Sequence, residues 1–514
     1  GGWPTTAVLM HTGEILFQAN FLEAEELQSA LKESRVLYAE HKHELEDRAA
    51  RIWAKVETAA KHRAPPDGSI DKSMVDQSVA IMQESFDVQN GGFTRAPKFF
   101  DPDAITFAFL LYHRSKNEAF QQMALKTLHA QLELFDPVWG GFYRYAEGAD
   151  WSSPHYEKLL ETQALNLQNY LEAYQSTGDR KSRAVAERTL AYVTRFLFAS
   201  APPGFYSSHD ADVRVIGAES RDVPGAEYFA LGERERLSLG LPAVDRTVYT
   251  SANAQMITSS LRVYQVLGDE HVRDLALRTL DHLYTERYYA GRGMARLVLD
   301  GVPQGIGLLG DQVTFAAALV EAYLTTGEGR YLERSERLVA DMTRHLEDEV
   351  GGGFFDRPRR SSERGLLRFP YKPVKENLRA SSLLSRLHYL TGRKDYLVSA
   401  ERTLRFVMQV DEALPVALVG LTVDRFLSYP VHVVVIGDKQ HRQSRDLFNE
   451  ALRLYAPGKI VRFLDPKQGP LAIGEVTFPN ADGPRAYICT DRFCSKPIGD
   501  PKDLEETLAL VLAA

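Results

Sequence analysis

The sequence has little cysteine, and this scarcity excludes two classes of small-domain architecture. Among its 514 residues only Cys489 and Cys494 are cysteines, so a disulfide framework and a four-cysteine metal site are both excluded. The two are separated by four residues, not by the two of a Cys-x-x-Cys redox motif. A structural disulfide or a buried thiol pair is the better interpretation.

Long apolar runs and strong charge are also missing. The longest apolar run near the carboxyl end, Leu414–Val423, is about half of what a bilayer span needs. The formal net charge is -8, and lysine and arginine are scattered, which argues against nucleic acid or an anionic membrane as partner. With 44% hydrophobic and 25% charged residues, the composition is that of a soluble globular protein with a large core.

A helical repeat is what the sequence does contain. Similar helix ends recur at Leu171–Gly178, Leu261–Gly268, Val320–Gly327 and Ser385–Gly392, each closing on a glycine. Apolar residues recur with helical spacing in twelve segments, which are 72–87, 102–114, 117–134, 155–177, 180–198, 250–267, 270–288, 311–326, 329–347, 376–391, 393–409 and 413–428. The repeat predicts six helical hairpins.

The connections between these segments alternate between tight turns and long loops. The long loops open with glycine and usually an aromatic residue, at Gly91–Phe99, Gly140–Arg144, Gly204–Ser208, Gly291–Met294 and Gly352–Asp356. Because consecutive helices are antiparallel, all long loops gather at one rim. The prediction is a mainly α fold, an (α/α)6 toroid whose inner helices direct their N-termini at that rim.

An open solenoid of the tetratricopeptide type is the alternative. Its period is about 34 residues, with short loops throughout. Equivalent tyrosines in this chain, Tyr174, Tyr264, Tyr323 and Tyr389, are much farther apart and irregularly spaced. The closed toroid is therefore favoured.

Two α/β segments flank the repeat. Residues 1–64 predict a strand, a turn, a strand and a long charged helix that ends in a linker. Residues 430–514 predict strands at 431–437, 459–463 and 485–489 with helices at 442–455 and from 501, a small α/β domain. The toroid is assigned to residues 70–429.

The loop Gly140–Lys158 is the densest in aromatic and ionisable side chains. Ser153 is expected to cap the following helix, with Pro154 at its first position, so that His155, Glu157 and Lys158 lie in the first turn. The positive end of a helix dipole attracts anions and hydroxyl oxygens. This loop is therefore the predicted centre of a ligand cleft.

The predicted site combines acid/base groups with groups that bind hydroxyls or sugar rings. Hydrolysis of a glycoside needs two carboxyl groups, whereas epimerisation needs a base such as histidine beside a carbonyl. The predicted catalytic residues are His155, Glu157, Asp210 and Asp212. The predicted substrate-binding residues are Lys98, Tyr143, Arg144, Trp151, Lys158, Asn253, Asp311, Glu376 and Asn377. No cofactor and no metal site are predicted.

Structural roles compete with these functional ones. His155 and Glu157 could simply cap a helix and pair with Arg144 or Lys158. Asp210 and Asp212 with His209 could form a divalent-metal cluster, although such turns more often bond their own backbone. Lys98 fits a structural ion pair equally well, and the Gly-Gly-Phe openings fit aromatic wedges of the core.

Several ordered motifs resemble a known family over nearly the whole chain. They are Gly1–Pro4, Gly91–Phe99, Gly140–Tyr145, Trp151, Pro154–Lys158, Ser208–Asp212 and Cys489 to Pro497. They resemble the thioredoxin-domain-containing proteins of the spermatogenesis-associated-protein-20 type. The resemblance implies a thioredoxin-like domain ending within residues 1–64, a six-hairpin glycosidase-like toroid akin to the N-acylglucosamine 2-epimerases, and a C-terminal α/β cap.

The chain departs from that family at three inner-helix openings. Ala252-Asn253 replaces a Trp-Asn pair, Asp311-Gln-Val313 replaces Asp-Tyr-Ala, and Val374–Asn377 replaces Pro-Ser-Gly-Asn. These changes alter the rim where the family's ligand site is expected.

Two functions follow as hypotheses. The first is a carbohydrate-active enzyme, a glycoside hydrolase or sugar epimerase; the second is a non-catalytic scaffold that binds a glycan or a protein partner. The chain begins at Gly1 without methionine or a secretory signal pattern, so an N-terminal portion is expected to be absent and no compartment is assigned.

Overall fold

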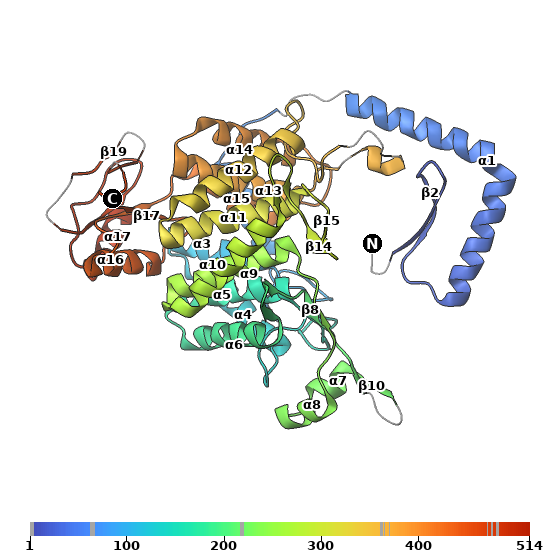
Figure 1. The fold of residues 1–514 in the computed structure, drawn as a ribbon, viewed down its shortest axis with the longest axis horizontal. Coiled ribbons are helices and arrows are strands. Elements are labelled where there is room, and N and C mark those ends of the chain that lie inside the picture. Colours follow the sequence, from blue (N-terminus) through green and yellow to red (C-terminus); the bar gives the residue numbers. More distant parts are fainter. Residues whose placement is uncertain are drawn as a thin grey trace.

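The computed structural model describes residues 5–61, 67–215, 220–359, 363, 365–369, 371–469, 471–473, 476–479 and 483–513. A body of packed helices occupies the middle of the molecule, with the C-terminal domain at one end of these helices and the strands β8, β14 and β15 at the other (Figure 1). The two ends of the helical body therefore differ: one carries the long loops and the other carries the C-terminal domain.

The helical body is a closed ring of hairpins. Its inner helices are α3 (Pro102–Ser115), α5 (Leu160–Thr177), α9 (Thr250–Leu267), α11 (Leu309–Thr326), α13 (Val374–Thr391) and α15 (Val416–Leu427). Each packs on the next, and α15 packs back on α3. The predicted (α/α)6 toroid is confirmed, and an open superhelix is excluded.

An outer helix covers each inner one. The outer helices are α4 (Glu118–Ala130), α6 (Arg180–Phe196), α10 (Glu270–Arg287), α12 (Gly329–Leu346), α14 (Lys394–Val407) and α2 (Lys72–Ser85). The first five pack on the inner helix that precedes them in the chain, whereas α2 packs on α15. The first helix of the toroid is thus the outer partner of its last inner helix.

The helix ends follow the capping chemistry expected from the sequence. Asp179 and Asp269 accept hydrogen bonds from backbone N–H groups in the first turns of α6 and α10. Gly178 and Gly268 end α5 and α9 at φ values of 73° and 77°. Glycine adopts this left-handed conformation without strain, so each inner helix stops and the chain turns within two residues.

The helix after the loop Gly140–Lys158 begins later than predicted. Pro154–His155 forms strand β4, paired with β3 (Tyr145–Ala146), and Lys158–Leu159 forms β5, paired with β8 (Ser208–His209). Ser153 has a φ of 59° and does not cap α5. The prediction of His155, Glu157 and Lys158 in a first helical turn is wrong. This part of the chain is extended instead, because its backbone pairs with strands β3 and β8.

The rest of the rim consists of short elements. The strands are β6 (Phe198–Ser200), β7 (Pro203–Phe205), β9 (Val213–Val215), β10 (Arg221–Val223), β11 (Val244–Asp245), β12 (Tyr288–Tyr289), β13 (Gly293–Met294), β14 (Leu297–Leu299) and β15 (Val302–Gln304). The helices are α7 (Gly225–Phe229) and α8 (Glu233–Leu239), with 3-10 turns at Gln131–Leu134 and Gly365–Arg368. The sequence did not predict α7 and α8, which are too short to show periodicity.

The C-terminal domain is built on a three-stranded sheet. Strand β16 (His432–Ile436) lies between β17 (Ile460–Leu464), to which it is parallel, and β20 (Arg485–Cys489), to which it is antiparallel. Helices α16 (Arg442–Arg453) and α17 (Asp503–Ala513) and the pair β18 (Ala472–Ile473) and β19 (Val476–Thr477) complete it. The predicted α/β domain is observed.

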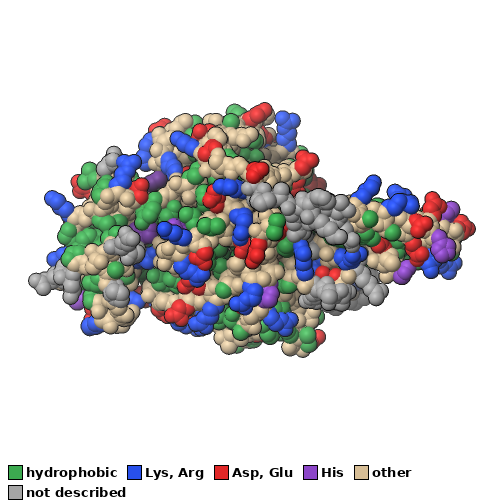
Figure 2. All heavy atoms as spheres, turned by 90° about the horizontal axis from the view of Figure 1, so that it is seen from above, with side chains coloured by type: hydrophobic (Ala, Val, Ile, Leu, Met, Phe, Trp, Pro, Cys, Tyr) green, Lys and Arg blue, Asp and Glu red, His purple; other side chains and the backbone are tan. Residues whose placement is uncertain are grey.

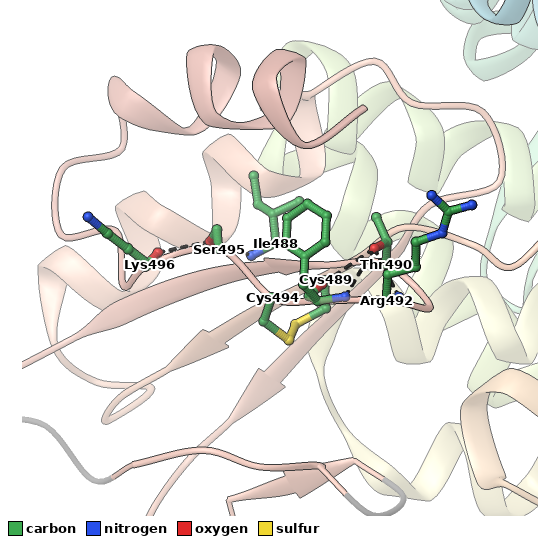
Figure 3. The surroundings of a disulfide bond; sticks show 8 residues. Ile488, Cys489, Thr490, Arg492, Cys494, Ser495 and Lys496 are labelled. Atoms are coloured by element: carbon green, nitrogen blue, oxygen red, sulfur yellow. Dashed lines mark hydrogen bonds between the residues drawn. A yellow bond between two sulfur atoms is a disulfide. The ribbon is translucent and has the colours of Figure 1, made fainter. Parts of the chain in front are cut away.

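A disulfide closes the turn that follows β20. Cys489 and Cys494 are bonded to each other, and Ser495 N–H donates to the Ile488 carbonyl at 2.8 Å (Figure 3). The bond links the end of the strand to the chain returning beside it. Of the two interpretations offered by the sequence, the structure contains the structural disulfide.

The N-terminal segment is a hairpin followed by one long helix. Strands β1 (Thr6–Leu9) and β2 (Ile15–Ala19) pair antiparallel, and α1 (Ala24–Lys61) follows, interrupted at His41. Histidine, acidic and basic side chains gather at the end of the molecule on the right of Figure 2. Near the interruption of α1, His43 and Lys42 each lie 3.9 Å from Glu46. The thioredoxin-like character of this segment stays a prediction. No helix in the described part of the chain has the length and apolarity needed to span a bilayer.

Candidate functional site

One turn is repeated at three of the long loops. An aspartate is followed four and five residues later by two glycines and then a phenylalanine, starting at Asp87, Asp136 and Asp348. In each turn the first glycine N–H donates to the aspartate carbonyl at 2.8 to 3.0 Å. At the second turn, a Cβ on Gly140 would lie 2.6 Å from the Arg188 carbonyl oxygen, so only glycine fits there.

A lysine from the chain just before the next inner helix binds each turn. Lys98 Nζ lies 2.7 Å from Asp87 Oδ2 and donates to the Gly91 carbonyl, and Lys372 Nζ binds Asp348 in the same way at 2.7 Å. Lys98 is fully buried. Lys98 was predicted to bind substrate; this is wrong, because its ammonium group is enclosed within the turn that it stabilises.

The middle turn carries the most deeply buried charges. Lys158 Nζ lies 2.7 Å and Arg236 Nη1 2.9 Å from Asp136 Oδ2, and all three side chains are fully buried. Burial alone would raise the pKa of Asp136, but the two cations outweigh it and lower that pKa. Burial also lowers the pKa of Lys158 to about 8. Lys158 is therefore a structural cation, contrary to its prediction as a substrate-binding residue.

Aromatic rings surround this trio of Asp136, Lys158 and Arg236. Tyr143 packs edge-on against Phe229 at 5.2 Å, and the Lys158 ammonium lies 4.2 Å from the Tyr192 ring centre. Tyr143 is buried, and so is Trp151, whose indole N–H donates to the Asn90 carbonyl at 3.0 Å. Neither ring offers a face to a ligand, so their predicted roles as binding platforms are wrong.

Side-chain amides hold the long loops to the inner helices. At the fourth residue of α5, α9, α11 and α13, an amide accepts from the N–H and donates to the carbonyl of one loop residue. The pairs are Gln163 with Phe142, Asn253 with Phe205, Gln312 with Met294, and Asn377 with Phe354. Asn253 and Asn377 are fully buried, so these two predicted binding residues are scaffold residues instead.

His209 is a buried titratable group at the base of the rim. Its Nδ1 lies 3.0 Å from the Tyr192 hydroxyl, and burial lowers its pKa from 6.5 to about 4. The folded protein therefore binds this proton less tightly than the unfolded chain, and His209 stabilises the fold fully only above about pH 6.5.

We expect this stabilisation to be lost as the pH falls from 6.5 to 4. By pH 4 the loss is about 3 kcal/mol, following from the two pKa values. Urea unfolding of the wild type and of His209→Asn at several pH values measures this loss of stability. We expect the difference between their two free energies of unfolding to become smaller as the pH falls. A difference that is constant across this range would contradict the assignment.

One group of predicted residues does meet at the surface of the rim. The Tyr145 ring stacks on His155 at 4.9 Å and on Phe99 at 4.9 Å, and Phe99 is 46% exposed. Arg144 Nη1 donates to Glu157 Oε2 at 2.8 Å, and His155 Nδ1 lies 3.6 Å from the same oxygen. We call these five residues the rim cluster. Its side chains are partly exposed and come from the β3–β4 hairpin and the chain beside it.

The two predicted aspartates lie on the loop next to the rim cluster. Strand β5 pairs with β8, which runs into Asp210, and Gly225 packs against Tyr156. Asp210 accepts from the Ala211 N–H at 2.7 Å and Asp212 from the Gly225 N–H at 2.7 Å. Both bond their own loop, as the structural alternative proposed. Within the described ranges, no group of three or more His, Cys, Asp or Glu side chains is arranged to hold a metal ion.

The remaining predicted residues lie where the inner helices begin. Asp311 is almost fully buried; it accepts from the Ser251 N–H at 3.0 Å, and burial raises its pKa to about 6. It caps α9 from the neighbouring helix through Oδ1, whereas its buried Oδ2 has no hydrogen-bond partner among the described residues, so a substrate-binding role for Asp311 stays a prediction. Glu376, in the first turn of α13, is half-buried and lies beside Gly310.

Sequence reasoning missed the polar pairs that join inner helices across this mouth of the toroid. Arg379 of α13 lies 3.1 Å from Asp103 of α3, and Gln255 of α9 donates to Glu161 of α5 at 3.4 Å. Each lies within the first two turns of its inner helix. No sequence motif marks these residues. They could have been predicted only from their positions in the first turns of the inner helices, on the side that faces other inner helices.

Solved structures with this architecture define the class of fold. A D-mannose isomerase superposes with a TM-score of 0.54 at 11% identity, covering 69% of this chain and 96% of that one. Cellobiose 2-epimerase from Bacillus thermoamylovorans (TM-score 0.51, 13% identity, 67% and 90% covered) and an alpha-mannanase from Bacteroides thetaiotaomicron (0.51, 10%, 69% and 94%) are similar too. The toroid is of the six-hairpin glycosidase-like type.

Among curated proteins, the chain is similar to spermatogenesis-associated protein 20. The human protein is 25% identical over 99% of this chain and 79% of its own length, and the rat protein is 26% identical over 83% and 68%. No protein-family model matches the sequence. The resemblance to this type of protein that the motifs indicated is confirmed.

Proposed function

We propose that this chain binds a carbohydrate at the rim cluster and catalyses the removal and return of a proton at a carbon atom of that sugar, as a sugar epimerase or isomerase does. The observation that carries the proposal is the stack of Phe99, Tyr145 and His155 beside the Arg144–Glu157 ion pair. Sugar rings have an apolar face that suits exposed aromatic rings and hydroxyls that suit charged hydrogen-bonding groups. The rim cluster supplies both kinds of group.

In the proposed reaction His155 acts as the base. It would remove the proton from the carbon next to the sugar's carbonyl, leaving an enediolate whose oxygen Arg144 would stabilise. Protonation of that carbon on its opposite face by a water molecule gives the epimer, and His155 returns its proton to the hydroxide so formed. Glu157 Oε2, 3.6 Å from His155 Nδ1, would orient the imidazole toward the sugar.

Proton transfer fits the rim cluster better than hydrolysis does. A glycosidase needs one protonated carboxyl group as acid and a second carboxylate. The rim cluster contains one carboxyl group, Glu157, whose Oε2 already accepts from Arg144 at 2.8 Å. The fold neighbours named as an isomerase and an epimerase are consistent with this choice, although they are similar in fold alone.

A non-catalytic, glycan-binding scaffold is the second candidate. It is favoured by the burial of Lys98, Tyr143, Trp151, Lys158 and Asn253, which leaves the rim with few groups for chemistry. The same experiment separates the two candidates.

The experiment follows hydrogen exchange on the sugar. Purified protein is incubated in D2O with D-mannose or cellobiose, and proton NMR measures the loss of the signal of the hydrogen at C2. We expect exchange with wild type and about 10²- to 10⁴-fold less with His155→Ala, because general-base catalysis contributes about that much. His43→Ala, at an exposed histidine on α1, is the matched control and should exchange as wild type does.

Binding is measured on the same samples by calorimetry. Phe99→Ala should weaken sugar binding by about three- to tenfold, through the lost aromatic face. Binding that depends on Phe99 without any exchange would favour the scaffold. Neither exchange nor binding, for either sugar, would count against a carbohydrate role of the rim cluster.

A further inference from the structure

A second polar site lies at the opposite end of the toroid from the rim cluster. A cavity of about 740 Å³ is lined by residues from all six inner helices and is covered by the C-terminal domain. The inner helices end there, at short turns for which no functional role was predicted. A volume of this size is typical of small-molecule sites.

The C-terminal domain covers the cavity and makes specific contacts with the ends of the inner helices. Arg462 donates to the Tyr389 and Leu390 carbonyls at the end of α13, both at 2.7 Å, and Lys439 donates to the Gly327 carbonyl after α11 at 2.8 Å. These cations satisfy carbonyl groups at the negative ends of helix dipoles. The Tyr455 hydroxyl also donates to Glu172 at 3.1 Å, inside the cavity.

Cationic side chains outnumber carboxylates in the cavity lining. Arg114, Lys116, Arg262, Arg386, Arg425 and Lys459 line it, against three acidic residues. Two of these arginines are paired: Arg386 lies 2.8 Å from Glu321 and Arg114 lies 2.6 Å from Asp424. An uncompensated positive charge remains.

Arg262 and Arg425 are two of the four remaining cations, the others being Lys116 and Lys459. Arg262 donates to the amide oxygens of Gln265 and Gln175 at 2.8 and 2.7 Å, and Arg425 donates to the Ser382 hydroxyl. Among the described residues neither guanidinium has a carboxylate within 4.0 Å. Arg262 is half-buried and Arg425 is exposed, and both hydrogen-bond only to neutral groups among the described residues, so their remaining N–H donors are available to an anion that enters the cavity.

We infer that this cavity binds a small molecule carrying a carboxylate or phosphate group, and that Arg262 and Arg425 are its anchors. Guanidinium groups recognise both anions through paired N–H donors. The Tyr389 and Tyr429 rings and the Leu421 side chain, which also line the cavity, provide surface for the rest of the molecule. This site stands independently of the function proposed for the rim.

Two anions test the site and distinguish the two ligand chemistries. The full chain is titrated with inorganic phosphate and, separately, with succinate, against sodium chloride at equal ionic strength, while the thermal midpoint and phosphorus NMR line width are recorded. We expect at least one anion to raise the midpoint more than chloride does. Arg262→Gln with Arg425→Gln should weaken binding of that anion at least tenfold.

The control is Arg183→Gln, which removes an exposed arginine of α6 that pairs with Glu187. It should bind as wild type does. Equal stabilisation of wild type and the double variant, or stabilisation by neither anion beyond that of chloride, would overturn the inference. If the double variant does not fold, crystals of the wild type soaked in tungstate decide: tungstate bound by Arg262 and Arg425 supports the site, and tungstate only elsewhere overturns it.

Discussion

Replacing Asp136 with asparagine is expected to lower the free energy of unfolding by about 3–5 kcal/mol, which is what breaking a buried ion pair costs. The variant leaves Lys158 and Arg236 fully buried without their shared carboxylate. Urea unfolding followed by far-ultraviolet circular dichroism measures the change. The loss should be full above about pH 4, where the Asp136 carboxyl is ionised in the unfolded chain, and should shrink at lower pH, because the fold lowers the pKa of this carboxyl.

The control for this variant is Glu187→Gln, at an ion pair whose two side chains are each nearly half exposed. Exposed pairs contribute about 0–1 kcal/mol, so this substitution should change stability by no more than that. If Asp136→Asn were as mild as the control, the trio would not be what anchors α8 to the second long loop.

The second large effect is expected at the amides that bind loop to helix. Asn253→Ala removes both partners of the Phe205 backbone, whose N–H and carbonyl bond the amide at 2.7 and 2.9 Å. Each buried polar group left without a partner costs about 1–3 kcal/mol, so the free energy of unfolding should fall by about 2–4 kcal/mol. Urea unfolding provides the measurement here as well.

Gln28→Ala, at an exposed amide of α1, is the comparison for Asn253 and should be nearly neutral. A loss restricted to Asn253 would confirm that the side chain belongs to the scaffold. If Asn253→Ala were as stable as wild type, the residue would again be available as a binding group.

The toroid could be predicted from the sequence because apolar residues and helix-ending glycines recur at regular positions along it. Apolar spacing placed the helices, and glycines at Gly178, Gly268, Gly327 and Gly392 placed their ends. The alternation of short and long connections then determined which helix ends share a rim. These are local signals, and the closed ring follows from them together with the need to cover each apolar face.

The site was less predictable, because composition does not reveal burial. Lys98 and Lys158 are charged residues in glycine-rich loops, which is also how ligand-binding residues are distributed. What makes them structural is a partner 11 or 22 residues away in the same folded turn, such as Asp87 or Asp136. Arg144, His155 and Glu157 do lie together, although His155 is in strand β4 and Glu157 follows that strand, rather than both lying in a helix.

The cavity under the C-terminal domain had no signal in the sequence. Its arginines are spread over α3, α9, α13 and α15 and come together only when the ring closes. In sequence, the last turns of these inner helices have the pattern of ordinary amphipathic helix ends. The spacing of their polar residues does not distinguish Arg262 from a solvated surface residue.

The pairing of α2 with α15 has a consequence for biosynthesis. Residues 72–85 (α2) pack against residues 416–427 (α15). During synthesis α2 therefore cannot make this contact until α15 has emerged from the ribosome. At about 5–20 residues per second, that delay lasts roughly 15–70 seconds, during which the apolar face of α2 has no native partner. Nascent chains that end before residue 416 should therefore engage chaperones more than chains that include α15.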